Sequence, residues 1–152
     1  MRSNHGWAAV FFLALLLALP ITVQARGGLE PEDFTVKGIA LGDAEEKMQA
    51  AFGTPDFDRV RMVWDIPVRY YTFPAGYVVG VAVDTVKVCD ILVRDRDYTA
   101  RAGVRYGATA YKIRTTFGEK RRTFLDGSVC YIYENPSDRR QRLILVAEPT
   151  DG

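Results

Sequence analysis

The chain has 152 residues, of which 48% are hydrophobic and 26% are charged, with a formal net charge of +1. A nearly neutral balance gives no reason to expect nucleic acid or an anionic membrane surface as a partner. The single histidine, His5, lies in an N-terminal segment with the pattern of a signal peptide. The rest of the chain therefore offers no Ser–His or Cys–His pair and no histidine-ligated metal site. This disfavours an enzyme or a cofactor.

Residues 1–25, "MRSNHGWAAVFFLALLLALPITVQA", form this segment. Arg2 supplies the positive start, residues 8–19 are apolar without a charge, and "VQA" at the end is a typical cleavage site. The apolar run is shorter than the roughly 20 residues of a spanning helix, although an uncleaved N-terminal anchor is the alternative. The segment contains no cysteine, so we expect no lipid anchor. The sequence thus predicts an exported protein, periplasmic or extracellular.

Residues 26–34, "RGGLEPEDF", look like a flexible leader, and the chain then divides into two units, 35–97 and 98–148. The division follows from a stretch that occurs twice, 65 residues apart, as "GIALGDAEEKMQAAFGTP" and "GVRYGATAYKIRTTFGEK". The two copies share Gly38/Gly103, Gly42/Gly107, Lys47/Lys112, Phe52/Phe117 and Gly53/Gly118. We expect two tandem units that bury one compact core together.

The repeated stretch predicts a short helix in each unit. In the first, Asp43 is the expected N-cap, and Glu46 three residues later completes a capping-box pattern. Gly53 is the expected residue after the helix, and Pro55 prevents its continuation. In the second unit Thr109 is the candidate cap.

Period-two patterns then predict strands. The first unit has four: Arg59–Trp64, Val68–Phe73, Tyr77–Val83 and Val86–Val93. They are separated by the turn candidates Ile66-Pro67, 74–76 and 84–85, and gaps this short permit only antiparallel pairing. In the second unit "RTFL", "SVCYIY" and "RLILVA" are joined by Asp126-Gly127 and "NPSD". The predicted fold class is α+β: an αββββ repeat followed by an αβββ repeat, with the helices packed on one face of antiparallel sheet.

The glycine-bounded helix followed by antiparallel strands resembles a loose group of bacterial exported modules. These are the N-terminal domain associated with CAP secreted proteins, the repeats of beta-lactamase inhibitory protein, and the BamE/SmpA-type outer-membrane lipoproteins. The resemblance covers most of residues 35–147, and the "GDAEEKMQAAFGTP" form is most similar to the first. It implies a sheet with helices on one face and a role in binding. The chain departs from these relatives because it has no downstream CAP domain, no lipobox cysteine and no second copy of the fourth strand.

The two cysteines, Cys89 and Cys130, lie in strand-like runs. An even number of cysteines in an oxidising compartment favours a disulfide, and the alternative is two buried thiols. The bridge would close a loop of 41 residues, which is worth on the order of 3–4 kcal/mol.

Aromatic residues at alternate strand positions are the candidate binding residues. If the helices cover the face of Cys130 and Ile132, the opposite face of the sheet is open and rich in tyrosine. Tyrosine and arginine make protein contacts at low entropic cost. The candidates are Arg69, Tyr71, Phe73, Tyr131 and Tyr133. The alternative interpretation is that these aromatic rings are core or edge packing.

These patterns predict an exported, non-enzymatic protein-binding or adaptor module of the bacterial cell envelope. One alternative is an inhibitor of an exported enzyme that acts through the open sheet face, and another is a self-associating structural component. Spaced acids such as Asp56/Asp58 and Asp95/Asp97 alternate with arginines, which is typical of solvated loops rather than catalytic pairs or a calcium loop. The expected partner is a protein, with no nucleic acid, cofactor or metal, and with a membrane only through an uncleaved signal segment.

Overall fold

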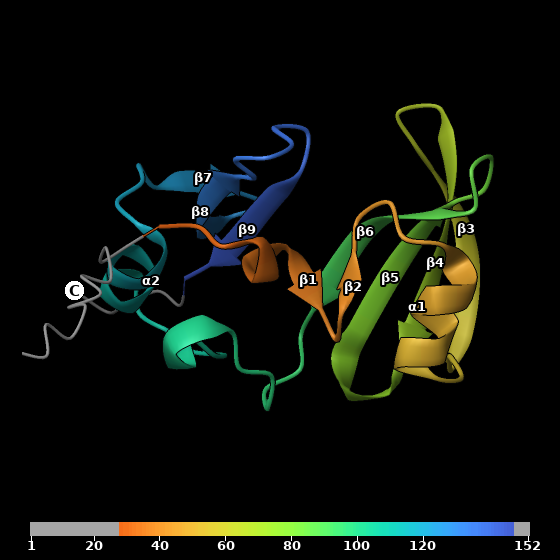
Figure 1. The fold of residues 1–152 in the computed structure, drawn as a ribbon, viewed down its shortest axis with the longest axis horizontal. Helices are drawn as coiled ribbons and strands as arrows, with labels where there is room; N and C mark the ends of the chain where they lie inside the picture. Colours follow the sequence, from red (N-terminus) through yellow and green to blue (C-terminus); the bar gives the residue numbers. More distant parts are fainter. Residues whose placement is uncertain (1–27, 148–152) are drawn as a thin grey trace, which may run out of the picture.

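The computed structural model describes residues 28–147, so the expected signal peptide lies outside the described residues. In this range nine strands form three antiparallel sheets, and there are two α-helices of eight residues each. Figure 1 shows the four-stranded and three-stranded sheets at opposite ends of an elongated molecule, with the two-stranded sheet between them.

The predicted fold class is wrong. The chain is mostly β, with three separate sheets, and it is not built as αββββ and αβββ repeats with helices packed on a sheet. The first stretch of the expected unit forms a sheet of its own, β1 (Thr35–Val36) with β2 (Ile39–Ala40), which the repeat did not predict. An eight-residue helix is also only about 12 Å long, so each helix lies over only part of a sheet face.

The four-stranded sheet has the order β3-β4-β5-β6. Its strands are β3 (Phe57–Val63), β4 (Ile66–Phe73), β5 (Tyr77–Ala82) and β6 (Lys87–Val93). These four strand predictions are confirmed to within two residues at each end. The predicted separator Ile66-Pro67 is wrong, because both residues belong to β4. The β3–β4 turn is formed by Trp64 and Asp65, with φ angles of 50° and 63°.

Helix α1 (Glu45–Phe52) begins differently from the prediction. Its N-cap is Ala44, which makes no side-chain cap, so the expected Asp43 capping box is absent. The Asp43 carboxylate instead accepts hydrogen bonds from the Ala40 amide and the Lys47 ammonium group, both at 2.8 Å. These bonds, the Ala40 one foremost, lower the pKa of Asp43. The prediction for the helix end is confirmed, since Gly53 has a φ of 83° and donates to the Gln49 carbonyl.

The remaining elements are α2 (Ala110–Phe117) and the sheet β7 (Thr123–Leu125), β8 (Ser128–Glu134) and β9 (Arg142–Val146), in that order. The three strands predicted from "RTFL", "SVCYIY" and "RLILVA" are confirmed to within one residue at each end, and two local predictions are confirmed as well. Thr109 caps α2 by accepting from the Lys112 amide at 3.3 Å. Asp126 and Gly127 form the β7–β8 turn with positive φ angles of 48° and 79°, as a type I′ hairpin requires.

Each end of the molecule has its own core. In the first, Met48 and Phe52 of α1 join Tyr71, Phe73 and Tyr77, and the rings of Phe52 and Phe73 lie 5.2 Å apart. The second consists of Val104, Ile113, Phe117, Tyr131, Tyr133 and Ala147. The chain therefore stabilises two small cores rather than one large one.

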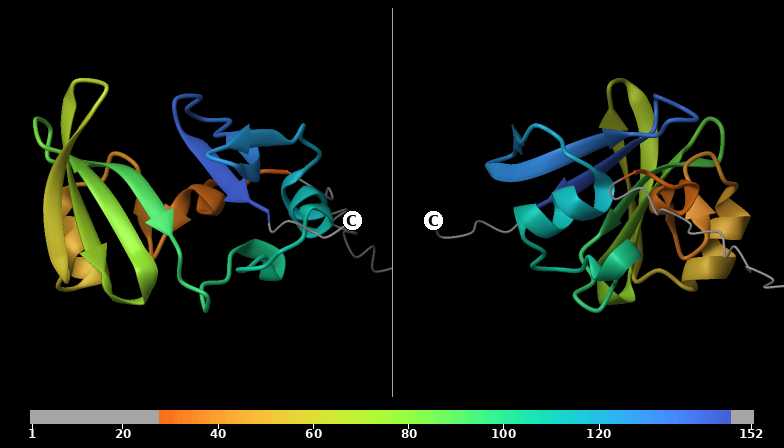
Figure 2. Two further views of the ribbon diagram at one scale, coloured as in Figure 1. Left: turned by 180° about the vertical axis from the view of Figure 1, so that it is seen from behind. Right: turned by 60° about the vertical axis from the view of Figure 1, so that its left-hand side comes forward.

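The N-terminal segment connects the two ends. Part of the expected leader forms a 3₁₀ helix, Pro31–Phe34, directly ahead of β1. Asp33 of this helix forms an ion pair with Arg101, which leads into the second half of the chain. The described part of the leader thus packs against the fold, and the left view in Figure 2 shows this segment between the two larger sheets.

Candidate binding surface

The predicted binding residues lie on two strands that belong to different sheets. Arg69, Tyr71 and Phe73 are on β4, and Tyr131 and Tyr133 are on β8. All four aromatic side chains are buried, and only Arg69 is exposed. The structure therefore corrects the expectation of an open tyrosine face and gives these rings a place in the two cores.

The reason is that each helix lies on the aromatic side of its sheet. Phe117 of α2 packs against Tyr133 with their ring centroids 5.9 Å apart. The Tyr133 hydroxyl donates to the Gly118 carbonyl at 2.9 Å, and burial raises the pKa of Tyr133 to about 12. In the first core the Tyr71 hydroxyl donates to the Glu45 carboxylate. These hydroxyl groups fix helix ends to sheets, which is a structural role.

Arg69 remains available at the surface. Its guanidinium lies 3.7 Å from the Asp58 carboxylate on β3, and hydrogen bonding with Tyr71 raises the pKa of Arg69. Next to it is a hollow of about 170 Å³ lined by Glu45, Arg69, Val81, Val83 and Val86. This volume is below the roughly 300 Å³ of a usual small-molecule pocket, so the hollow is a shallow depression of the surface.

The predicted Cys89–Cys130 disulfide is not formed, since both cysteines are free. Cys89 is the additional residue at the irregularity in the β5–β6 register and is exposed, whereas Cys130 is buried in the other sheet. The Cys89 thiol donates to the Gly80 carbonyl at 3.5 Å, and burial raises the pKa of Cys89. The two halves are thus held together by packing and ion pairs and not by a disulfide cross-link.

The face of Cys130 and Ile132, which was expected to lie under a helix, is the open face of the three-stranded sheet. Its register places Cys130 opposite Val146 and Ile132 opposite Ile144. Val146 and Ile144 are exposed, as is Leu125 on β7. The open side is therefore aliphatic rather than aromatic.

A larger exposed apolar surface lies at the end of the four-stranded sheet that carries the β3–β4 and β5–β6 turns (Figure 1). We call it the tip surface. Its residues and their exposed fractions are Val60 (52%), Met62 (64%), Trp64 (93%), Val83 (40%) and Val86 (44%). The strand register makes it continuous: Met62 pairs with Pro67, whose carbonyl accepts from the Val83 amide at 2.9 Å.

Two residues of the tip surface have left-handed backbone conformations. Trp64 has a φ of 50° and Val86 a φ of 56°. Positive φ is unfavourable for bulky and β-branched residues, which is why glycine or asparagine usually occupies such turns. Sequence reasoning placed Trp64 in a strand and missed this surface. The available signal was the absence of a glycine between two strands only two residues apart.

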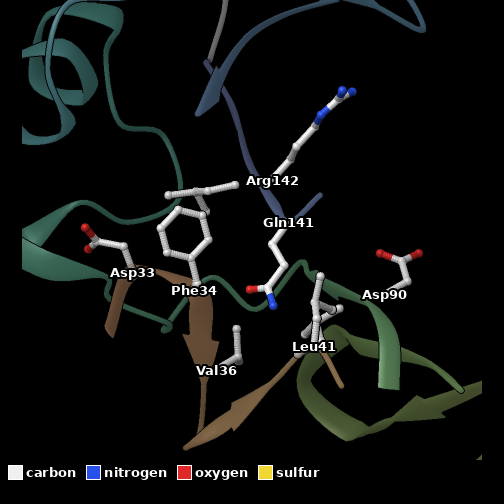
Figure 3. A pocket seen from close by; sticks show the side chains of 9 residues that line it. Asp33, Phe34, Val36, Leu41, Asp90, Gln141 and Arg142 are labelled. Atoms are coloured by element: carbon white, nitrogen blue, oxygen red, sulfur yellow. The ribbon is translucent and has the colours of Figure 1, made fainter. Parts of the chain in front are cut away.

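A second hollow, of about 100 Å³, lies where the N-terminal segment meets the two larger sheets. Figure 3 shows Phe34, Val36 and Leu41 of the N-terminal segment around it, together with Asp90 from β6, Gln141 just before β9 and Arg142 at the start of β9. Partial burial raises the pKa of Asp90, although a hydrogen bond from Tyr70 opposes the shift. The hollow has room for only a few water molecules, so it is a packing defect at a junction rather than a ligand site.

Among the described residues, no group of three or more His, Cys, Asp or Glu side chains is placed to hold a metal ion. None of the helices in residues 28–147 is long and apolar enough to cross a membrane. The chain matches no protein-family model, and no match is found among curated proteins or solved structures. The resemblance to exported bacterial modules stays a prediction.

Proposed function

We propose that this chain is an exported, non-enzymatic module that binds a protein partner through the tip surface. The observation that carries the proposal is the display of Trp64, 93% exposed at the end of a hairpin. Tryptophan is among the residues that contribute most to protein interfaces, and its contacts gain from neighbouring apolar side chains that exclude water. Met62 and Val60 on the same hairpin are such neighbours.

The backbone conformation of the turn supports this role. A tryptophan at positive φ costs folding energy, on the order of 1 kcal/mol, that a glycine would not. An exposed side chain gives little in return within the folded monomer. A binding partner that buries the indole would account for its position. Export rests on the signal-peptide pattern of residues 1–25 alone.

Site-specific photo-crosslinking tests the proposal. A benzophenone amino acid replaces Trp64 in one variant and Tyr111, an exposed residue of α2, in the control. We expect position 64 to capture a distinct protein in the cells that produce this chain. That protein is then purified and titrated against the unlabelled module, where Trp64→Gly should weaken binding about 30-fold and Tyr111→Ala should leave it unchanged.

Two outcomes would contradict the proposal. In the first, positions 64 and 111 capture the same set of proteins, which would indicate non-specific contact. In the second, Trp64→Gly leaves the affinity for the purified partner unchanged. If the captured protein is a second copy of this chain, and sedimentation shows that Trp64→Gly dissociates it, the self-associating structural role replaces the adaptor role.

A further inference from the structure

The two edges of the four-stranded sheet differ. At the β6 edge the segment ahead of α1 pairs with Val88: the Gly42 amide donates to the Val88 carbonyl at 2.7 Å, and the Val88 amide donates to the Asp43 carbonyl at 2.9 Å. At the other edge, within residues 28–147, β3 has β4 as its only neighbour in the sheet. Alternate backbone groups of β3 therefore point outward without a strand to pair with.

β3 has charged side chains but lacks two other features that usually prevent an edge strand from pairing, a proline and a bulge. It contains no proline or glycine, and its seven residues pair with β4 in an unbroken register. An edge strand whose residues served only to prevent pairing with another chain would not carry exposed apolar side chains. On β3, however, Val60 and Met62 are exposed on the face that α1 shares, and Phe57 is exposed on the other face.

Two arginines give this edge a charge pattern. By strand alternation Arg59 and Arg61 share the face of Phe57 and Val63, whereas Asp58 shares the face of Val60 and Met62. Both arginines are exposed. Neither Arg59 nor Arg61 takes part in an ion pair of the described residues, whereas Asp58 is paired with Arg69. The edge thus presents two positive charges, two residues apart, that lack a carboxylate partner within residues 28–147.

A second copy of β3 is a poor occupant of this edge. When two copies pair antiparallel with their faces matched, every register that joins five or more residues of Phe57–Val63 places one arginine opposite another. Arg59 then faces Arg61 or its own counterpart, or Arg61 faces its counterpart. Like charges directly opposite each other destabilise a strand pair. The same arrangement favours a strand with carboxylates at alternate positions.

We propose that the partner supplies an extended acidic segment that adds to β3 as a fifth strand, with two carboxylates at alternate positions facing Arg59 and Arg61 and with apolar side chains on the other face beside Val60 and Met62. Main-chain hydrogen bonds to the outward groups of β3 supply affinity, and the two ion pairs select the register. This inference rests on the proposed function, because it names the chemistry of the partner that the tip surface would bind.

Synthetic peptides test the inference without knowledge of the natural partner. The probe is an acetylated and amidated peptide, VLEVEKV, which when antiparallel to β3 places glutamates opposite Arg61 and Arg59 and a lysine opposite Asp58. Control peptides are VLQVQKV and the probe with alternate amides N-methylated. Labelled peptides are titrated with the protein by fluorescence anisotropy. We expect both controls to bind at least about ten times more weakly than the probe.

A charge-reversed protein provides the reciprocal test. Arg59→Glu/Arg61→Glu should lose the acidic probe and bind VLKVKKV instead, which keeps the lysine opposite Asp58. The matched control is Arg121→Glu/Arg122→Glu, which changes the net charge equally at exposed positions before β7 and should bind the probe as the parent does. Circular dichroism confirms that each variant is folded. Hydrogen exchange with bound probe should show added protection in β3 and none in β7.

The inference is overturned if VLQVQKV binds as well as the probe, if the charge-reversed protein retains the acidic probe, or if the added protection lies outside β3. Those results leave the proposed function standing, provided that a partner captured at position 64 still loses affinity with Trp64→Gly. Conversely, a probe that binds β3 while no partner depends on Trp64 would support strand addition and remove the tip surface from the proposal.

Discussion

Arg101 and Asp33 lie 68 positions apart in the chain, and their side chains meet with 2.9 Å between Nη2 and Oδ2. The Asp33 side chain is only 2% exposed. The same guanidinium donates to the Thr116 carbonyl at 3.3 Å and lies over the Phe117 ring, 5.3 Å from its centroid. A single arginine therefore joins the N-terminal 3₁₀ helix to the second core.

Removing either partner of this pair should destabilise the fold. Arg101→Met leaves a nearly buried carboxylate without its cation, so we expect the free energy of unfolding to fall by about 3 kcal/mol. Arg101→Lys should restore only part of this, because a lysine cannot bridge two acceptors in the same plane. Urea denaturation measures the effect, with exposed Arg105→Met as the control. Equal midpoints for Arg101→Met and Arg105→Met would contradict the role assigned to the pair.

Gly80 is required by close packing rather than by its backbone angle. A Cβ at this position would lie 2.9 Å from Cε1 of Tyr70 and 3.1 Å from Cβ of Asp90. We expect Gly80→Ala to lower the free energy of unfolding by about 2 kcal/mol, because the ring and the strand must move apart. Gly28→Ala is the matched control, since that position has open space. A thermal melt in which both variants keep the parent's midpoint would contradict this packing.

The β3–β4 turn allows stability and binding to be separated. Both turn residues have positive φ, so glycine at either one relieves strain. Trp64→Gly and Asp65→Gly should each raise the free energy of unfolding by about 0.5–1 kcal/mol. Only Trp64→Gly should weaken partner binding, because Asp65→Gly keeps the indole. If both variants are destabilised, Trp64 contributes to folding and its exposure says nothing about a partner.

The buried tyrosines predict a loss of stability at alkaline pH. Burial, with a 2.7 Å hydrogen bond to Asp95, raises the pKa of Tyr77 to about 12. Since the unfolded value is about 10, the folded state holds this proton more tightly. Its contribution is therefore complete below pH 10 and is lost as the pH rises through 12. In urea titrations, Tyr77→Phe should reduce the fall in the free energy of unfolding between pH 10 and 12 by roughly 2 kcal/mol. An unchanged slope would exclude Tyr77 as its cause.

The free thiols can be counted directly. With a chromogenic disulfide-exchange reagent at pH 8, only Cys89 of the native protein should react, and it should react slowly because burial raises the pKa of its thiol. Cys130 is buried and should not react. In urea both should react. Cys89→Ser should abolish the native reaction and leave one thiol in urea. If the unreduced parent shows no thiol even in urea, the two residues form the bridge that the sequence favoured.

The strands of the four-stranded and three-stranded sheets were predictable because their signals are local. Alternation of apolar residues and the turn residues around Gly76 and Gly127 indicate where strands begin and end, whatever the rest of the chain does. Helix ends at Gly53 and Gly118 follow from the same kind of short-range chemistry. The role of Asp43 did not, because the Ala40 amide competes with the helix start for the same carboxylate.

The candidate site was not predictable for a different reason. On β8 both faces are apolar, with Tyr131 and Tyr133 on one and Cys130 and Ile132 on the other, so the pattern cannot say which face the helix meets. Which side is covered depends on α2, whose approach is set by residues distant in sequence. Trp64 was missed because a turn with two non-glycine residues at positive φ contradicts local preference.

The difference between the two edges of the four-stranded sheet also has a consequence for stoichiometry. The hydrogen bonds of Gly42 and Asp43 reach β6 only at Val88, so the backbone alone does not decide where a new strand adds. The two arginines that would select an acidic segment, Arg59 and Arg61, both belong to β3. One module would then bind one acidic segment, and the complex would reach a fixed mass at saturation.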